Sequence, residues 1–234
     1  MNKLDLVECI NEINAYKYCI VKPSIDFPMY VSGQDVDIFC YNIQDVAKKI
    51  LAVLRRYVSA GYTIRLTDKK QQIYIDILVD KKIEFRFDLY GSLPQYQNVS
   101  IKDSFFESVI ENAICIKTTI NSTGLTYFIP MPLDDLILRY IEYQEWYSQR
   151  PDKIKHVDYI NNYLSLDPHE YKTLFDRLHR YISLPEVWED RSIAKYSFLR
   201  NGSYILSIFG KACQIYKKEG VLKMLARIRK KVLR

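Results

Sequence analysis

Two acidic residues, Asp35 and Asp37, stand one residue apart in an Asp-Val-Asp stretch that directly follows a Ser-Gly-Gln turn. If residues 35–41 form a strand, the two-residue period of side chains puts both carboxylates on the same face of a sheet. Magnesium commonly takes one or two protein carboxylates and fills its remaining positions with water and substrate phosphates. The pair therefore indicates metal-assisted chemistry on a nucleotide. The alternative is a turn and a strand whose exposed face carries two acids.

The segments around the acid pair predict alternating helices and strands. Three signals indicate these elements: helical spacing of apolar residues near the N-terminus, a short apolar run ended by proline, and an Asn cap before an amphipathic stretch. In chain order we expect a helix over 3–16, a strand over 18–22, a loop over 23–34, the acid-bearing strand over 35–41, and a helix from Asn42 to the stop at Gly61.

Three more strands are predicted at 62–67, 73–79 and 83–90, the last two joined by a short polar connection that suits a hairpin. In the last strand Glu84, Arg86 and Asp88 alternate with apolar residues. Such alternation predicts a sheet with one buried face and one open, polar face.

Beyond residue 102 the pattern becomes mainly helical. We expect helices over 105–114, 133–148 and 152–164, a further helix capped by Asp167, and one strand over 125–129. The sequence therefore predicts an α+β fold in two domains: an α/β domain over 1–130 and a helical domain over 131–234.

The bulk composition is that of a globular protein: 234 residues, 48% hydrophobic, with only 7 Gly and 8 Pro. No apolar run approaches the roughly 20 residues needed to span a bilayer. Acids inside the first apolar stretch argue against a secretory signal. The five scattered cysteines, without Cys-x-x-Cys spacing, predict reduced and mostly buried thiols in a cytoplasmic protein.

The net charge of +6 is unevenly distributed. Residues 211–234 hold nine basic residues and one acid, so this segment carries +8 and residues 1–210 carry −2. Because the body of the protein is not basic, we expect no stable complex with duplex nucleic acid. The basic segment also has an apolar stripe, which leaves two interpretations: a helix that docks on the domain, or peripheral contact with the inner membrane face.

Histidines and tyrosines give weaker signals. The three histidines (His156, His169 and His179) lie in the helical half without metal-ligand spacing, so we interpret them as surface or core residues. Tyr140, Tyr143 and Tyr147 recur at helical spacing, which predicts packing against a core.

Three features occur in order: the turn Ser32-Gly-Gln34, the strand Asp35-Val-Asp-Ile38, and a later acid in Phe85-Arg-Phe-Asp-Leu-Tyr-Gly91. Together they resemble the signature of the nucleotidyltransferase-fold superfamily. More narrowly, Ile20-Val-Lys-Pro23 before the acid pair is similar to a bacterial subgroup often associated with surface-polysaccharide gene clusters. The resemblance covers roughly residues 15–150, and includes Tyr127-Phe-Ile-Pro-Met-Pro132.

This resemblance implies a Mg²⁺- or Mn²⁺-dependent transfer of a nucleotidyl group from a nucleoside triphosphate to a small-molecule, sugar or protein acceptor. It implies that residues 1–130 form the nucleotidyltransferase-like domain. Asp35, Asp37 and Asp88 would hold the metal, with Asp88 as possible base. Lys22, Ser32 and Gly33 would contact the nucleotide, Gly33 through a close backbone approach.

Several alternatives stay open at this point. The third acid could be Asp76 or Glu84 instead of Asp88. The chain could be a non-catalytic nucleotide-binding or regulatory module with the same fold. It could also be an antitoxin-like nucleotidyltransferase that modifies a partner protein. The turn before the acid pair is shorter than is common in the family.

Overall fold

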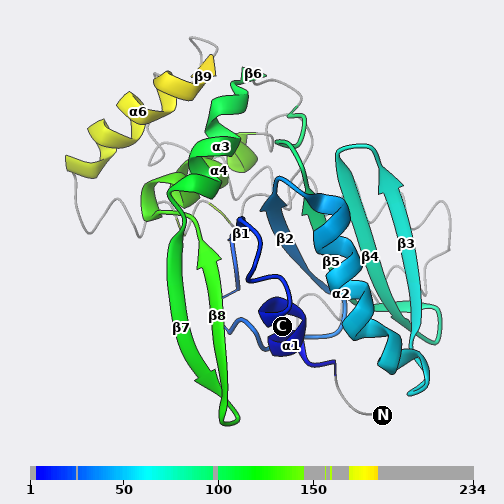
Figure 1. The fold of residues 1–234 in the computed structure, drawn as a ribbon. Coiled ribbons are helices and arrows are strands. Elements are labelled where there is room, and N and C mark those ends of the chain that lie inside the picture. The colour runs from blue at the N-terminus through cyan, green and yellow to red at the C-terminus, as the bar shows by residue number, and fades with distance from the viewer. Residues whose placement is uncertain are drawn as a thin grey trace, which may run out of the picture.

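The structure is a computed structural model that describes residues 4–24, 26–96, 100–144, 156, 159 and 169–183 (Figure 1). At its centre lies a five-stranded mixed sheet. Its strands are β1 (Tyr18–Val21), β2 (Gln34–Cys40), β3 (Thr63–Lys69), β4 (Gln72–Val79) and β5 (Lys82–Tyr90). The spatial order is β1-β2-β5-β4-β3. Only β2 and β5 are parallel, and the other neighbours run antiparallel.

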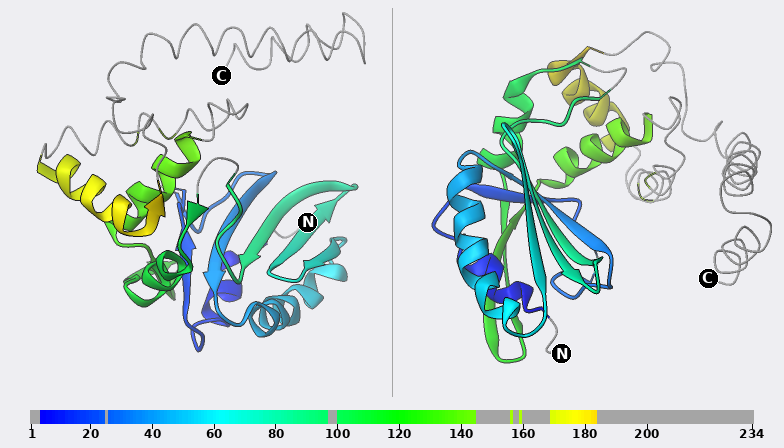
Figure 2. Two further views of the ribbon diagram at one scale, coloured as in Figure 1. Left: turned by 90° about the horizontal axis from the view of Figure 1, so that it is seen from above. Right: turned by 90° about the vertical axis from the view of Figure 1, so that its right-hand side faces the viewer.

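One face of the sheet is covered by α1 (Leu6–Asn11) and α2 (Ile43–Val58), and Figures 1 and 2 show α2 lying along it. Helix α2 buries Val46, Ile50 and Leu54 completely, because residues four apart share one side of a helix. These side chains meet the apolar face of the strands, including Ile38 and Phe87, and form a first hydrophobic core.

A second core lies on the opposite face, at the β1–β2 side of the sheet. It is formed by α3 (Asp103–Glu111), α4 (Pro132–Gln144) and α6 (His169–Tyr181), which Figure 1 shows grouped together away from α2. Phe39 of β2 packs against Phe106 of α3, with ring centroids 5.1 Å apart. Strand β2 thus contributes to both cores through its alternate side chains.

Two small antiparallel pairs complete the described chain. The hairpin of β7 (Ile114–Ile120) and β8 (Thr123–Ile129) extends beside α1 and β1 (Figure 1). The short strands β6 (Ser100–Ile101) and β9 (Ile182–Ser183) pair with each other.

The predicted α+β class and the order of the first seven elements are confirmed. The helix expected over 3–16 is shorter, at Leu6–Asn11, and the helix expected over 105–114 spans Asp103–Glu111. Strand β7, which begins at residue 114, was not predicted. Most of the predicted helical domain over 131–234 lies outside the described residues. So do the helix cap Asp167 and the basic segment 211–234.

Among the described cysteines, Cys9, Cys19 and Cys40 are buried free thiols, as predicted, whereas Cys115 is exposed. Tyr140 and Tyr143 are buried in the second core, which confirms their packing role. Within the part of the chain that the structure describes, no helix is long and apolar enough to cross a membrane.

Candidate functional site

The acid pair lies opposite the acid of a neighbouring strand. Because β2 and β5 are parallel and adjacent, Asp37 pairs in register with Asp88, and Asp35 pairs with Arg86. Residues in register on neighbouring strands share a face of the sheet. The structure therefore brings Asp35, Asp37 and Asp88 together on the face that carries the second core.

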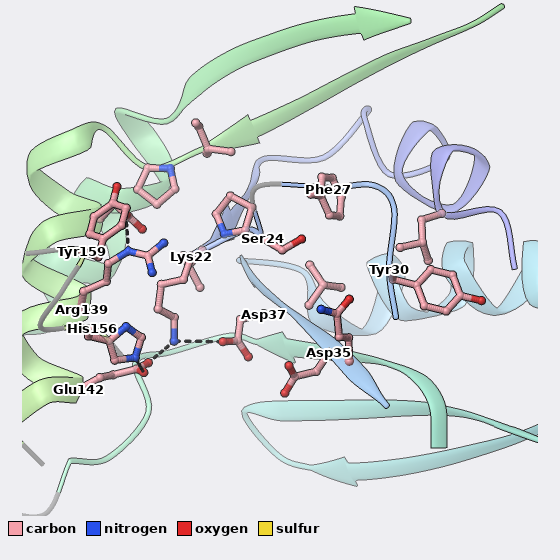
Figure 3. Close-up of a pocket in the computed structure, with 18 of the residues that line it drawn as sticks. Lys22, Ser24, Phe27, Tyr30, Asp35, Asp37, Arg139, Glu142, His156 and Tyr159 are labelled. Carbon is pink, nitrogen blue, oxygen red and sulfur yellow. Dashed lines mark hydrogen bonds and ion pairs between the residues drawn. The ribbon is translucent and has the colours of Figure 1, made fainter. Parts of the chain in front are cut away.

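In front of the acid pair is a cavity of about 860 Å³. Asp35 and Asp37 from β2 border it on one side, and side chains of α4 border it on the other, as Figure 3 shows. The lining side chains labelled there are Lys22, Ser24, Phe27, Tyr30, Asp35, Asp37, Arg139, Glu142, His156 and Tyr159.

Lys22 lies between two carboxylates (Figure 3). Its Nζ is 3.1 Å from Asp37 Oδ2 and also contacts Oε1 of Glu142. Glu142 Oε2 is in turn 2.9 Å from Nε2 of the buried His156. Burial alone would lower the pKa of Lys22, but the charges of Asp37 and Glu142 outweigh it and hold that pKa above its ordinary value. Lys22 is therefore a permanent ammonium ion in the wall of the cavity.

Asp88 has an incompletely satisfied carboxylate. The residue is 6% exposed, and its Oδ1 has no hydrogen-bond partner. Arg86 Nε lies 3.7 Å from this oxygen, which is too long for a hydrogen bond. Burial, followed by the negative charge of Asp37, raises the pKa of Asp88 to about 7, although Arg86 opposes the shift. A buried carboxylate with an unpartnered oxygen beside a second carboxylate is suited to accept a cation or a proton.

Asp76, an alternative third acid, is occupied by arginines. Arg65 Nε donates to its Oδ2 at 2.8 Å, and Arg86 Nε donates to its Oδ1 at 2.5 Å. Burial would raise the pKa of Asp76, but these hydrogen bonds outweigh it and hold the pKa below its usual range. Of the three candidates, only Asp88 pairs in register with Asp37.

Glu84, the other alternative, lies at an irregularity between β4 and β5. Ile83 pairs with Leu78 and Phe85 pairs with Ile77, so Glu84 has no partner on β4. The alternation expected for Glu84, Arg86 and Asp88 is interrupted there. Glu84 lies beside Tyr30: after burial, its charge is the largest cause of the raised pKa of that phenol.

Ser32 and Gly33, predicted to contact a nucleotide, are not among the residues that line the cavity. Gly33 has φ +88°, and a Cβ there would meet only the carbonyl oxygen of Ile83, at 4.0 Å. The positive φ is by itself a reason for glycine at this position. The Gly33 N–H donates to the Glu84 carbonyl at 2.8 Å. From the same loop and the start of β2, Ser24 and Gln34 line the cavity.

Sequence reasoning missed five polar lining residues from the C-terminal part of the chain: Asp135, Arg139, Glu142, His156 and Tyr159. His156 was interpreted as a surface or core residue; it is buried, and pairs with Glu142 at the cavity. Arg139 Nε donates to Asp135 at 2.7 Å, and its guanidinium lies 3.9 Å from the ring centre of Tyr159. The available signal was a set of charged residues at positions 135, 139 and 142, whose spacing places them on one side of the helix.

Among the residues that the structure describes, no three His, Cys, Asp or Glu side chains are already gathered closely enough to hold a metal ion. Comparison with protein-family models, curated proteins and solved structures gave no match. The geometry of the site is therefore the basis for any functional assignment.

Proposed function

We propose that the protein is a Mg²⁺- or Mn²⁺-dependent nucleotidyltransferase that moves a nucleotidyl group from a nucleoside triphosphate to an acceptor hydroxyl. The observation that carries the proposal is the pairing of Asp37 with Asp88 across adjacent strands, with Asp35 two residues away on the same face. The order of β1, a loop, acid-bearing β2 and α2 supports a nucleotidyltransferase-like fold for this part of the chain.

The chemistry of the donor set fits a divalent cation. All three acids offer hard carboxylate oxygens, Asp35 is exposed, and Asp88 has an unpartnered oxygen. Three prearranged protein ligands are not required, because magnesium often uses only one or two carboxylates. A bound cation would lower the pKa of the acceptor hydroxyl and stabilise the charge on the departing pyrophosphate.

The side chains of the cavity fit the remainder of a nucleotide. The volume of about 860 Å³ lies within the roughly 300–1,000 Å³ typical of ligand sites. Lys22 supplies a positive charge for phosphate oxygens, and the aromatic ring of Phe27 offers a stacking surface for a base. We infer that Lys22 exchanges its contact with Asp37 for a phosphate when a metal-bound triphosphate enters.

Calorimetric titration of the protein with ATP, GTP, CTP and UTP, with and without Mg²⁺ or Mn²⁺, tests the proposal. We expect metal-dependent binding of at least one triphosphate, and its loss in Asp37→Asn. The matched control is Asp45→Asn, which changes an exposed acid that pairs with Lys48 on α2. Equal binding by wild type and Asp37→Asn, or no binding of any triphosphate, would overturn the proposal.

A second candidate, a nucleotide-binding module without transfer, is favoured by two contacts. Lys22 already neutralises Asp37, and the Gly33 amide is already bonded to Glu84. Because of these contacts, the Gly33 N–H and the Asp37 carboxylate are less available to bind a phosphate or a metal ion during catalysis. Release of pyrophosphate during incubation with the bound nucleotide distinguishes the candidates: the transferase releases it, and the binding module does not.

A further inference from the structure

A second cavity, of about 280 Å³, meets the first at the acid pair. The two cavities share four lining residues: Lys22, Asp35, Asp37 and Glu142. The smaller one continues toward β5 and the segment after it, where it is lined by Asp88, Tyr90, Gln95 and Tyr96, among others.

Asp88, the possible base of the proposed transfer, lies at this smaller cavity. It lines the 280 Å³ cavity and not the 860 Å³ cavity. It is 6% exposed, and its Oδ1 has no hydrogen-bond partner. A buried polar atom without a partner is costly unless a ligand or water satisfies it. The Oδ1 atom itself is buried, but the residue that carries it lines a cavity that a hydroxyl group could enter.

The size and charge of the smaller cavity limit what it can hold. Its volume falls just below the roughly 300–1,000 Å³ of typical ligand sites, so it fits a molecule smaller than a nucleotide. Four carboxylates (Asp35, Asp37, Asp88 and Glu142) line it against one cation, Lys22, whereas Arg139 adds a second cation to the larger cavity. Without a bound metal ion, the smaller cavity therefore disfavours a phosphorylated ligand. The phenols and amide of Tyr90, Tyr96 and Gln95 are groups that hydrogen-bond to neutral hydroxyls, and the rings offer apolar faces.

We propose that the smaller cavity is the acceptor subsite and that it takes a neutral, monosaccharide-sized polyol, one hydroxyl of which lies against Asp88. This inference rests on the proposed function. In an in-line displacement the acceptor oxygen and the pyrophosphate lie on opposite sides of the transferred phosphorus. Two cavities that meet at Asp35 and Asp37 provide separate spaces for the two substrates. The acceptor O–H bond and the bond to pyrophosphate break as the new phosphorus–oxygen bond forms, and the proton passes to the Asp88 carboxylate.

Ligand-observed NMR titration of the full chain with glucose, galactose and N-acetylglucosamine tests the subsite. We expect at least one of these neutral sugars to bind. For the sugar that binds, we expect a roughly three- to tenfold weaker affinity in Gln95→Ala, the usual effect of losing a neutral hydrogen bond. Gln95 is exposed, so its replacement should leave the fold intact. The control is Gln44→Ala, an exposed glutamine on α2 that bonds Asp68. Glucose 6-phosphate should bind at least tenfold more weakly than glucose.

The outcomes separate this inference from the proposed function. Absence of binding by all three sugars, equal sugar affinity in wild type and Gln95→Ala, or tighter binding of glucose 6-phosphate overturns the acceptor subsite. Titration of Mg²⁺ and ATP, GTP, CTP or UTP into Gln95→Ala should match wild type, because Gln95 does not line the larger cavity. If sugars bind in a Gln95-dependent way while no triphosphate binds, the subsite stands as a polyol site and the proposed transferase fails.

Discussion

At the residue scale, the site is a set of charged side chains, several of which are compensated by a neighbouring charge of opposite sign. Lys22 has a side chain only 15% exposed and contacts both Asp37 and Glu142. Glu142 also contacts His156. Taking charges out of water is costly, and removing one partner leaves the other charge uncompensated. Lys22 is thus at once the counter-ion of Asp37 and Glu142 and a candidate contact for a phosphate.

Replacement of Lys22 by methionine, which keeps the length but removes the charge, should destabilise the metal-free protein. We expect a loss of about 3 kcal/mol in the free energy of unfolding, because the buried Glu142 and the half-buried Asp37 lose their cation. Urea denaturation measures it. Lys48→Met is the control, since the side chain of Lys48 is 73% exposed and pairs only at the surface. The double variant Lys22→Met/Glu142→Gln should recover part of the loss. An unchanged midpoint in Lys22→Met would contradict this account.

Asp88 predicts an unusual pH dependence. Its pKa is about 7 in the folded chain and about 3.9 in an unfolded one, so the folded protein binds this proton more tightly. The contribution of this group to the free energy of unfolding is therefore fully present below about pH 4. It falls by about 2–4 kcal/mol as the pH rises to about 7. Asp88→Asn should be more stable than wild type at pH 8, with a flatter profile between pH 4 and 8 in EDTA. Parallel profiles for Asp88→Asn and wild type would show that Asp88 is not the group responsible.

At the element scale, the sequence predicted the strands of the sheet because their apolar residues either form a continuous run, as in the fully buried β1, or alternate with polar residues, as in β5. The hairpin between β4 and β5 was expected and is present. Strand β7 was missed because it is largely exposed on both faces, so Lys117, Thr118 and Thr119 give no apolar alternation. Glu84 broke the expected alternation because a one-residue irregularity between paired strands leaves no periodic trace in the sequence.

The turn of the β4–β5 hairpin contains a correctable strain. Asp80 and Lys81 both have positive φ, at +50° and +64°. This left-handed conformation costs a non-glycine residue roughly 1–2 kcal/mol. Lys81→Gly should therefore raise the free energy of unfolding by about 1 kcal/mol, measured by urea denaturation. The adjacent Lys82→Gly is the matched control, because Lys82 lies in β5 and glycine weakens a strand. A stabilising Lys82→Gly, or a destabilising Lys81→Gly, would count against this explanation.

At the scale of the whole molecule, the site is formed where two cores meet on β2. Asp35 and Asp37 are local in sequence, so their shared face could be predicted from spacing alone. Lys22 and Glu142 are 120 residues apart, and no local pattern encodes their contact. The α4 side of the cavity follows from packing of the second core, which is why sequence reasoning missed it.

The shared strand predicts that the two cores unfold together. Ile38 and Phe39 are neighbours on β2, but Ile38 is buried in the first core and Phe39 in the second. Ile38→Ala should cost about 2–5 kcal/mol and Phe39→Ala about 3–5 kcal/mol. Because both side chains share one backbone strand, each variant should still show a single urea transition by circular dichroism and by tyrosine fluorescence. Native-state hydrogen exchange should then show faster exchange of the slowest amides in α3 and in β4–β5 for both variants. If Phe39→Ala accelerated exchange in α3 alone, the second core would be an independent unit, and the cavity could open without unfolding of the sheet.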